Sequence, residues 1–90
     1  MTEREIKLNK EYRGRIMRLV AMFYPTPTSL KQLQIGLLEY GMSSQADIDK
    51  HLHYLEDRAY ITRKEADMYN ITADGIDLIE GTKSDDGLLL

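Results

Sequence analysis

The chain has 90 residues, the size of one domain, and 42% of them are apolar. Twelve basic residues stand against fifteen acidic ones, so a formal charge of −3 excludes nucleic-acid binding through bulk charge and leaves only a local patch for it. The absence of cysteine excludes disulfides, thiolate metal sites and cysteine nucleophiles. No apolar run reaches the roughly 18 to 20 residues of a membrane span, and no signal peptide is recognisable, so we expect a soluble, cytoplasmic protein.

The first predicted helix covers residues 9–24. Its apolar residues have the spacing of one helical face: Tyr12, Ile16, Leu19, Val20 and Phe23. Asn9 is the expected N-cap, and Pro25 ends the helix because the residue before a proline avoids the helical region. Residues 1–8 are therefore expected to form an N-terminal extension outside the domain.

Two further helices are predicted on either side of a tight turn at residues 41–43. Ser29 and Gln32 have the spacing of a capping box, so a second helix is expected to begin at residues 28–29 and to end by Gly41. Ser44 and Asp47 repeat this spacing for a third helix, in which Asp47 is most simply a capping partner. The third helix is expected to bury one face, made of Ile48, Leu52 and Leu55.

The period of the pattern changes after residue 57. Short runs of β-branched and aromatic residues at 60–63 and 68–72 predict an antiparallel hairpin that turns at residues 64–67. Thr72 is the expected N-cap of a short final helix that ends at Gly81. Residues 82–90 are expected to be a flexible acidic tail with an apolar tip.

This order of elements resembles the winged helix-turn-helix domain over residues 8–81. Residues 46–57 are similar to a recognition helix of the form S-T-V-S-R-H-L-K-x-L-E-E, and residues 58–62 are similar to the start of a first wing strand. Residues 71–81 are similar to the closing pattern L-T-x-x-G-x-x-L-L-x-G. The resemblance implies an α+β, mainly α fold, in which residues 9–81 form a three-helix winged helix-turn-helix domain with a two-stranded wing and a short C-terminal helix.

Within this fold the chain resembles small Mu-like phage and prophage proteins that consist of one winged-helix domain and a short tail. The resemblance rests on residues 15–19, the turn at residues 37–41, residues 54–57 and the pair Asp86 and Gly87. We therefore predict a small DNA-binding protein that acts as a transcriptional regulator of phage or prophage type.

If the third helix lies in a major groove, its outward positions contact the DNA. Gln45 suits adenine, Lys50 suits guanine or a phosphate, and His53 suits the backbone. Asp49 repels phosphates unless it accepts a hydrogen bond from a cytosine amino group. The hairpin tip and the first helix add further cations. The predicted DNA-binding residues are Gln45, Asp49, Lys50, His53, Arg63, Lys64 and Arg13.

Charge is unevenly distributed along the chain. Residues 3–18 hold six basic and three acidic residues (+3), residues 43–58 hold two and four (−2), and residues 73–90 hold one and five (−4). A homodimer would double a modest cationic footprint, and the expected dimer or partner contact is the apolar tip Leu88, Leu89 and Leu90 or the exposed side of the first helix. The acidic third helix supports an alternative function, a winged-helix adaptor that binds a protein partner and no DNA.

The sequence does not predict an enzyme. His51 and His53 are two residues apart and do not share a helix face, while Asp47 with His51, or Asp49 with His53, supplies two ligands where a metal needs about three or four. The sequence contains no glycine-rich phosphate loop, nucleophile elbow or H-E-x-x-H motif. We predict a binding module that has no metal or cofactor.

Overall fold

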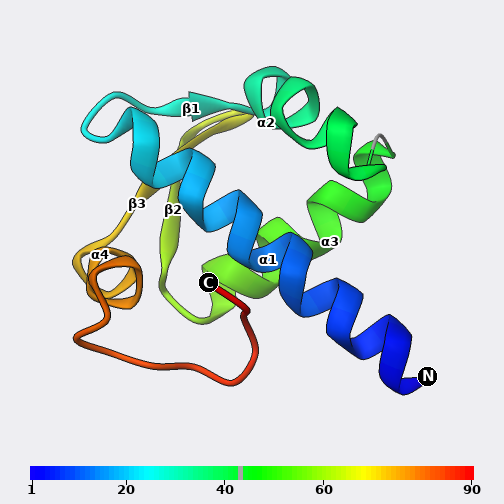
Figure 1. Ribbon diagram of the computed structural model, residues 1–90. Coiled ribbons are helices and arrows are strands. Elements are labelled where there is room, and N and C mark those ends of the chain that lie inside the picture. The colour runs from blue at the N-terminus through cyan, green and yellow to red at the C-terminus, as the bar shows by residue number, and fades with distance from the viewer. Residues whose placement is uncertain (43) are drawn as a thin grey trace.

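The computed structural model describes residues 1–42 and 44–90, which form an α+β fold that is mainly helical (Figure 1). The elements in chain order are α1 (Glu3–Phe23), β1 (Thr28–Ser29), α2 (Leu30–Leu37), the 3₁₀ turn η1 (Leu38–Tyr40), α3 (Gln45–Asp57), β2 (Ile61–Glu65), β3 (Met68–Ile71) and α4 (Ala73–Glu80). Ser43, which belongs to the expected turn between the second and third helices, lies outside the described residues. In the described part of the chain, no helix is both long and apolar enough to cross a bilayer.

Helix α1 begins much earlier than predicted. Its N-cap is Thr2, whose side chain accepts a hydrogen bond from the Glu5 amide at 3.2 Å, and Asn9 lies within the helix. Glu3 and Glu5 in the first turn also favour a helix start because they interact well with the positive end of the helix dipole. The expectation of a separate extension at residues 1–8 is therefore wrong. Residues 3–8 are the first turns of α1, and they project beyond α3 (Figure 1).

The other helix starts agree with the sequence-based prediction. Ser29 and Gln32 form both hydrogen bonds of a capping box, Ser44 accepts from the Asp47 amide at 3.4 Å, and Thr72 accepts from the Gly75 amide at 3.1 Å. Each serine or threonine thus satisfies an amide that has no partner inside its helix. Glycines end η1 and α4 in the left-handed conformation, which costs glycine little.

The three-stranded antiparallel sheet has the order β1, β3, β2. The β2–β3 hairpin lies where two strands were predicted, with Ile61 opposite Ile71, but β2 continues to Glu65, so the turn covers residues 66–67 and not 64–67. Strand β1 was not predicted, since its two residues are too few to show a period; Thr28 pairs with Tyr69. The pairing ties the start of α2 to the hairpin, and the Leu30 amide reinforces it by donating to the Asp67 carbonyl at 2.8 Å.

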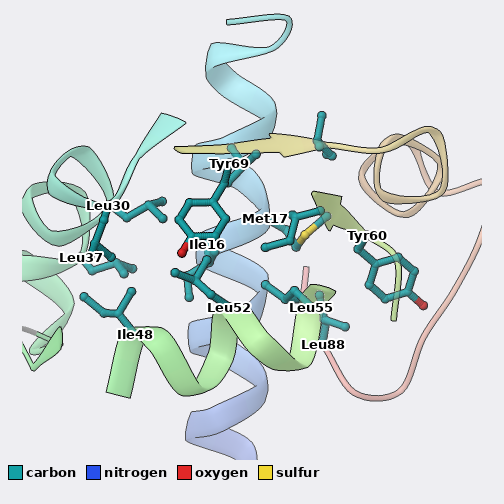
Figure 2. Packing of buried hydrophobic residues seen from close by; sticks show 14 of the residues in the cluster. Ile16, Met17, Leu30, Leu37, Ile48, Leu52, Leu55, Tyr60, Tyr69 and Leu88 are labelled. Carbon is teal, nitrogen blue, oxygen red and sulfur yellow. The ribbon is translucent and has the colours of Figure 1, made fainter. Parts of the chain in front are cut away.

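The core lies between α1, α3 and the sheet. Figure 2 shows Ile16 and Met17 of α1 together with Leu52 and Leu55 of α3 and with Tyr69 of β3. The predicted inward face of α3 is confirmed, because Ile48, Leu52 and Leu55 are fully buried. The contacts among these elements fix the position of the outward face of α3 relative to the hairpin.

Residues 82–90 are docked on the body of the protein, in contrast to the expected flexible tail. Leu88 is buried in the core, and the Leu89 amide donates to the Lys10 carbonyl at 3.1 Å. Gly14 permits this approach, since a Cβ atom there would lie 1.8 Å from the Leu89 carbonyl oxygen. The periodicity of the sequence does not reveal this docking, which depends on a gap in the surface of α1.

Asp85 holds the tail against the junction of α3 and β2. It accepts hydrogen bonds from the Arg58 guanidinium at 2.9 Å, from the Gly87 amide at 2.7 Å and from the Tyr60 hydroxyl. Burial opposes the charge of Asp85, but the bonds from Tyr60 and Gly87 and the charge of Arg58 hold its pKa below the usual value. Burial, together with Asp85, raises the pKa of Tyr60 to about 12. This acid of the tail is therefore committed to an internal contact.

Candidate nucleic-acid interface

The outward face of α3 carries the predicted reading residues. Gln45, Lys50 and His53 are exposed and Asp49 is partly buried, while the neighbouring residue His51 points inward and is 1% exposed. The Ser44 cap and the buried leucines on the inner face set the rotation of the helix, so these positions follow from the packing. The structure thus presents one glutamine, one lysine and one histidine to the solvent along α3.

Arg63 and Lys64 of the hairpin differ in how strongly other residues of the protein hold them. Lys64 is exposed, whereas the Arg63 Nη2 atom lies 3.2 Å from the Glu56 carboxylate and its guanidinium carbon lies 5.2 Å from the centroid of the Tyr69 ring. The pKa of Arg63 lies above its usual value, first because of Tyr69 and then because of the hydrogen bond to Glu56. Arg63 is therefore partly neutralised by α3 before any ligand arrives.

Acidic residues outnumber basic ones on α3 and the hairpin. Between residues 44 and 67 six acids oppose four bases, which leaves a formal charge of −2. Two of those bases, Arg58 and Arg63, already form ion pairs with Asp85 and Glu56. Among the ion pairs of the described residues, none includes Lys50 or Lys64, so these two lysines are the cations of this surface that remain open to a phosphate.

Arg13, which was predicted to contact DNA, is held inside the fold. Its guanidinium stacks on the ring of Tyr54, and its Nη1 atom donates to the Gly87 carbonyl. The residue lies on the side of α1 that faces α3 and the tail, so the face of its guanidinium and its Nη1 donor are already engaged within the protein. The sequence shows how many basic residues the first helix carries, but it does not show which of them face solvent and which face the rest of the protein.

The apolar tip of the tail is divided between two roles. Leu88, predicted as a dimer contact, packs into the protein's own core, whereas Leu89 and Leu90 are 45% and 44% exposed.

Within residues 1–42 and 44–90, no three His, Asp or Glu side chains gather as metal ligands.

Sequence reasoning missed the residues that modulate the predicted site. Glu56 and Tyr69 hold Arg63, although 7 and 6 residues separate them from it in the chain. The alternation of the hairpin could have indicated the contact with Tyr69, since Arg63 and Tyr69 are directly paired across β2 and β3.

A comparison of the chain with protein families, curated proteins and solved structures finds no match.

Proposed function

We propose that this protein is a winged helix-turn-helix domain that binds double-stranded DNA and regulates transcription in the manner of small phage and prophage regulators. In this assignment α2 and α3 are the helix-turn-helix, α3 enters the major groove, and the β2–β3 hairpin is the wing. The order α1, β1, α2, α3, β2, β3 supports it, as does the position of β1 against β3. The observation that carries the proposal is the exposed row Gln45, Lys50 and His53 on α3.

The proposed footprint on DNA is small. Lys50 and Lys64 meet phosphates directly, and Arg63 joins them once a phosphate replaces Glu56 as its partner. Each neutralised phosphate contributes about −0.9 to the slope of log K against log salt, so a protomer with three such contacts has a slope of about −3. Binding by one protomer is therefore weak and strongly dependent on salt.

A homodimer would raise this affinity by doubling the contacts. Leu89 and Leu90 offer exposed apolar surface, and Ile6 on the projecting end of α1 is 41% exposed. Leu89 and Ile6 line the same shallow groove with Glu3, Lys7 and Lys10. We include a two-fold contact through this region in the proposal, with Leu88 excluded because it belongs to the core.

Fluorescence anisotropy with a labelled random duplex at low and moderate salt tests the proposal. We expect micromolar binding that weakens steeply with salt, and we expect Lys50→Gln and Lys64→Gln each to reduce both the affinity and the slope. Lys83→Gln, in the segment that follows α4, is the control and should have no effect. Absence of binding at micromolar protein, or binding without salt dependence, would count against DNA as the ligand.

A second candidate is an adaptor whose acidic α3 binds a basic protein partner. The observation that favours it is the presence of Asp47 and Asp49 in the first half of α3, followed by Glu56, which neutralises Arg63. Asp49→Asn separates the two functions. It should tighten DNA binding by removing repulsion from phosphates, whereas it should weaken capture of a basic partner by the adaptor.

A further inference from the structure

A groove with an apolar lining runs between α1 and α2. Its lining includes Leu19 and Met22 of α1, Gly36 of α2 and Tyr40 of η1. Gly36 brings the two helices close together, because a Cβ atom there would lie 2.9 Å from a Leu19 methyl carbon. The groove therefore follows directly from the packing of α1 on α2.

The wall of the groove next to η1 is held in place before any ligand binds. The Tyr12 hydroxyl donates to the Tyr40 carbonyl at 3.2 Å. The guanidinium carbon of Arg15 lies 3.5 Å from the centroid of the Tyr40 ring, so the ring is also covered by a cation from α1. A preformed wall of this kind lowers the entropy cost of binding a ligand.

Large apolar side chains at the groove are left open to solvent. Met22, which lines the groove from α1, is 70% exposed, and Tyr40, which lines it from η1, is 40% exposed. Isolated exposed apolar residues are common, but a group of them around one groove is typical of a protein contact site. The adjustable side chain of methionine is well suited to such a contact.

The charges beside the groove indicate the kind of partner. Arg15 and Arg18 lie on the α1 side, and among the described residues neither takes part in an ion pair. Glu39 is the acid that lines the same groove, so the two arginines leave an excess of positive charge. The N–H donors of Arg15 lie at the edge of its planar group and stay free when its face stacks on Tyr40.

We propose that this groove binds an amphipathic helix of a protein partner, with apolar side chains on one face and Asp or Glu beside them. The apolar side chains would cover Leu19 and Met22, and the carboxylates would pair with Arg15 and Arg18. The apolar lining favours such a helix over nucleic acid, which would contact the arginines and leave Leu19 and Met22 exposed.

The groove and the outward face of α3 are separate surfaces. α1 and α3 lie on different sides of the core residues that they share (Figure 2). Arg15, Arg18 and Met22 lie on the part of α1 turned away from the buried residues Ile16, Met17 and Val20. A partner helix in the groove can therefore be bound while α3 is occupied, and this inference does not depend on the proposal for DNA.

The test uses the full chain and three fluorescein-labelled synthetic peptides of about 15 residues. The first has Leu at i, i+3, i+4 and i+7 spacing with Glu beside it, the second has Lys in place of Glu, and the third has the composition of the first in scrambled order. Anisotropy should show binding of the first peptide, and the other two should bind at least about tenfold more weakly. Amide chemical shifts of residues 15–22 and 36–40 should change when the first peptide is added.

Variants then assign the binding to the groove. Arg18→Glu combined with Met22→Asp should weaken the acidic peptide by about tenfold or more, since it reverses a charge and adds another to the apolar wall. Lys64→Glu, on the hairpin, is the control and should leave the affinity unchanged. The proposal is overturned if the acidic peptide does not bind, if the basic or scrambled peptide binds equally well, or if unlabelled duplex DNA displaces the peptide from the groove.

Discussion

The guanidinium carbon of Arg13 lies 3.7 Å from the centroid of the Tyr54 ring, which joins the middle of α1 to the second half of α3. The same guanidinium donates to the Gly87 carbonyl at 3.2 Å, and Arg58 lies 5.0 Å from the Tyr54 centroid. One tyrosine ring thus contacts two arginines and lies beside the C-terminal tail. This arrangement gives Arg13 of the first helix a structural role in joining α1, α3 and the tail.

Replacement of Arg13 by alanine should destabilise the fold. Loss of the cation–π contact and of the hydrogen bond to Gly87 should lower the free energy of unfolding by about 1–3 kcal/mol. Urea denaturation followed by circular dichroism measures this change. Arg18→Ala, which removes an exposed arginine of the same helix, should cost less than about 0.5 kcal/mol. A loss of DNA affinity in Arg13→Ala at unchanged stability would show that this account of Arg13 is wrong.

Gly14→Ala should also destabilise the protein, although alanine is the better helix former. The new Cβ atom would collide with the Leu89 carbonyl and displace the tail, so Leu88 would lose its burial. The gain of about 0.5–1 kcal/mol in helix propensity is smaller than the loss of apolar burial, and we expect a net loss of about 1–2 kcal/mol. Hydrogen exchange of the Leu89 amide should accelerate in this variant. Asp86→Ala, in an exposed part of the tail, is the control, and a stabilised Gly14→Ala with a protected Leu89 amide would contradict the prediction.

His51 should make the protein less stable as the pH falls. Burial, and then the charges of Arg13 and Lys50, lower its pKa from 6.5 to about 4, while Asp47 acts in the opposite direction. The unfolded chain therefore takes up a proton near pH 6.5 and the folded chain only near pH 4. The stabilisation is complete above pH 6.5 and is lost progressively down to about pH 4, by on the order of 3 kcal/mol in total.

Denaturation curves between pH 7 and pH 4 measure the effect of His51. His51→Phe keeps an aromatic ring beside Tyr12, whose centroid lies 6.1 Å from that of His51, and removes the titrating group. Its stability should depend less on pH over this range than that of the wild type. Equal slopes in His51→Phe and the wild type would refute the assignment.

Glu56→Gln should strengthen the DNA binding that we propose. The variant removes the carboxylate that neutralises Arg63, so this guanidinium becomes available to a phosphate. We expect tighter binding of a random duplex, because Arg63 no longer has to leave Glu56, and a salt slope that stays near about −3, because Arg63 is already one of the three proposed phosphate contacts. Anisotropy titrations at several salt concentrations measure both quantities. Glu65→Gln, which removes the same charge elsewhere on the hairpin, should raise the affinity less and leave the contribution of Arg63 unchanged.

The parts of the fold that depend on local chemistry were predictable. Ser29, Ser44 and Thr72 cap helices as their spacing indicates, and Ile48, Leu52 and Leu55 are buried as their period indicates. The exception is the start of α1. Asn9 was assigned as a cap because the apolar stripe becomes regular only after it, but the chain upstream contains no helix breaker and Thr2 supplies an earlier cap.

For the candidate site, the sequence predicted which helix or strand carries each residue, but it did not predict the contacts that the residue makes. Lys50 and His53 point outward because the buried residues of α3 set its rotation. The contacts of Arg63 and Arg13 were not predictable, because each side chain is paired with a group from another element. Arg63 pairs with Glu56, and Arg13 stacks on the ring of Tyr54. A charge count along the sequence treats all cations as equally free, and three-dimensional pairing makes them unequal.

The sequence by itself determined where α2, α3 and α4 begin and which face of α3 is apolar, because helix caps and periodicity act over a few neighbouring residues. The tertiary structure alone decided that β1 joins the sheet, that residues 82–90 dock through Asp85 and Leu88, and which arginines remain free. These outcomes depend on distances between residues that are remote in the chain, such as Gly14 and Leu89, and only the packed core brings such residues together.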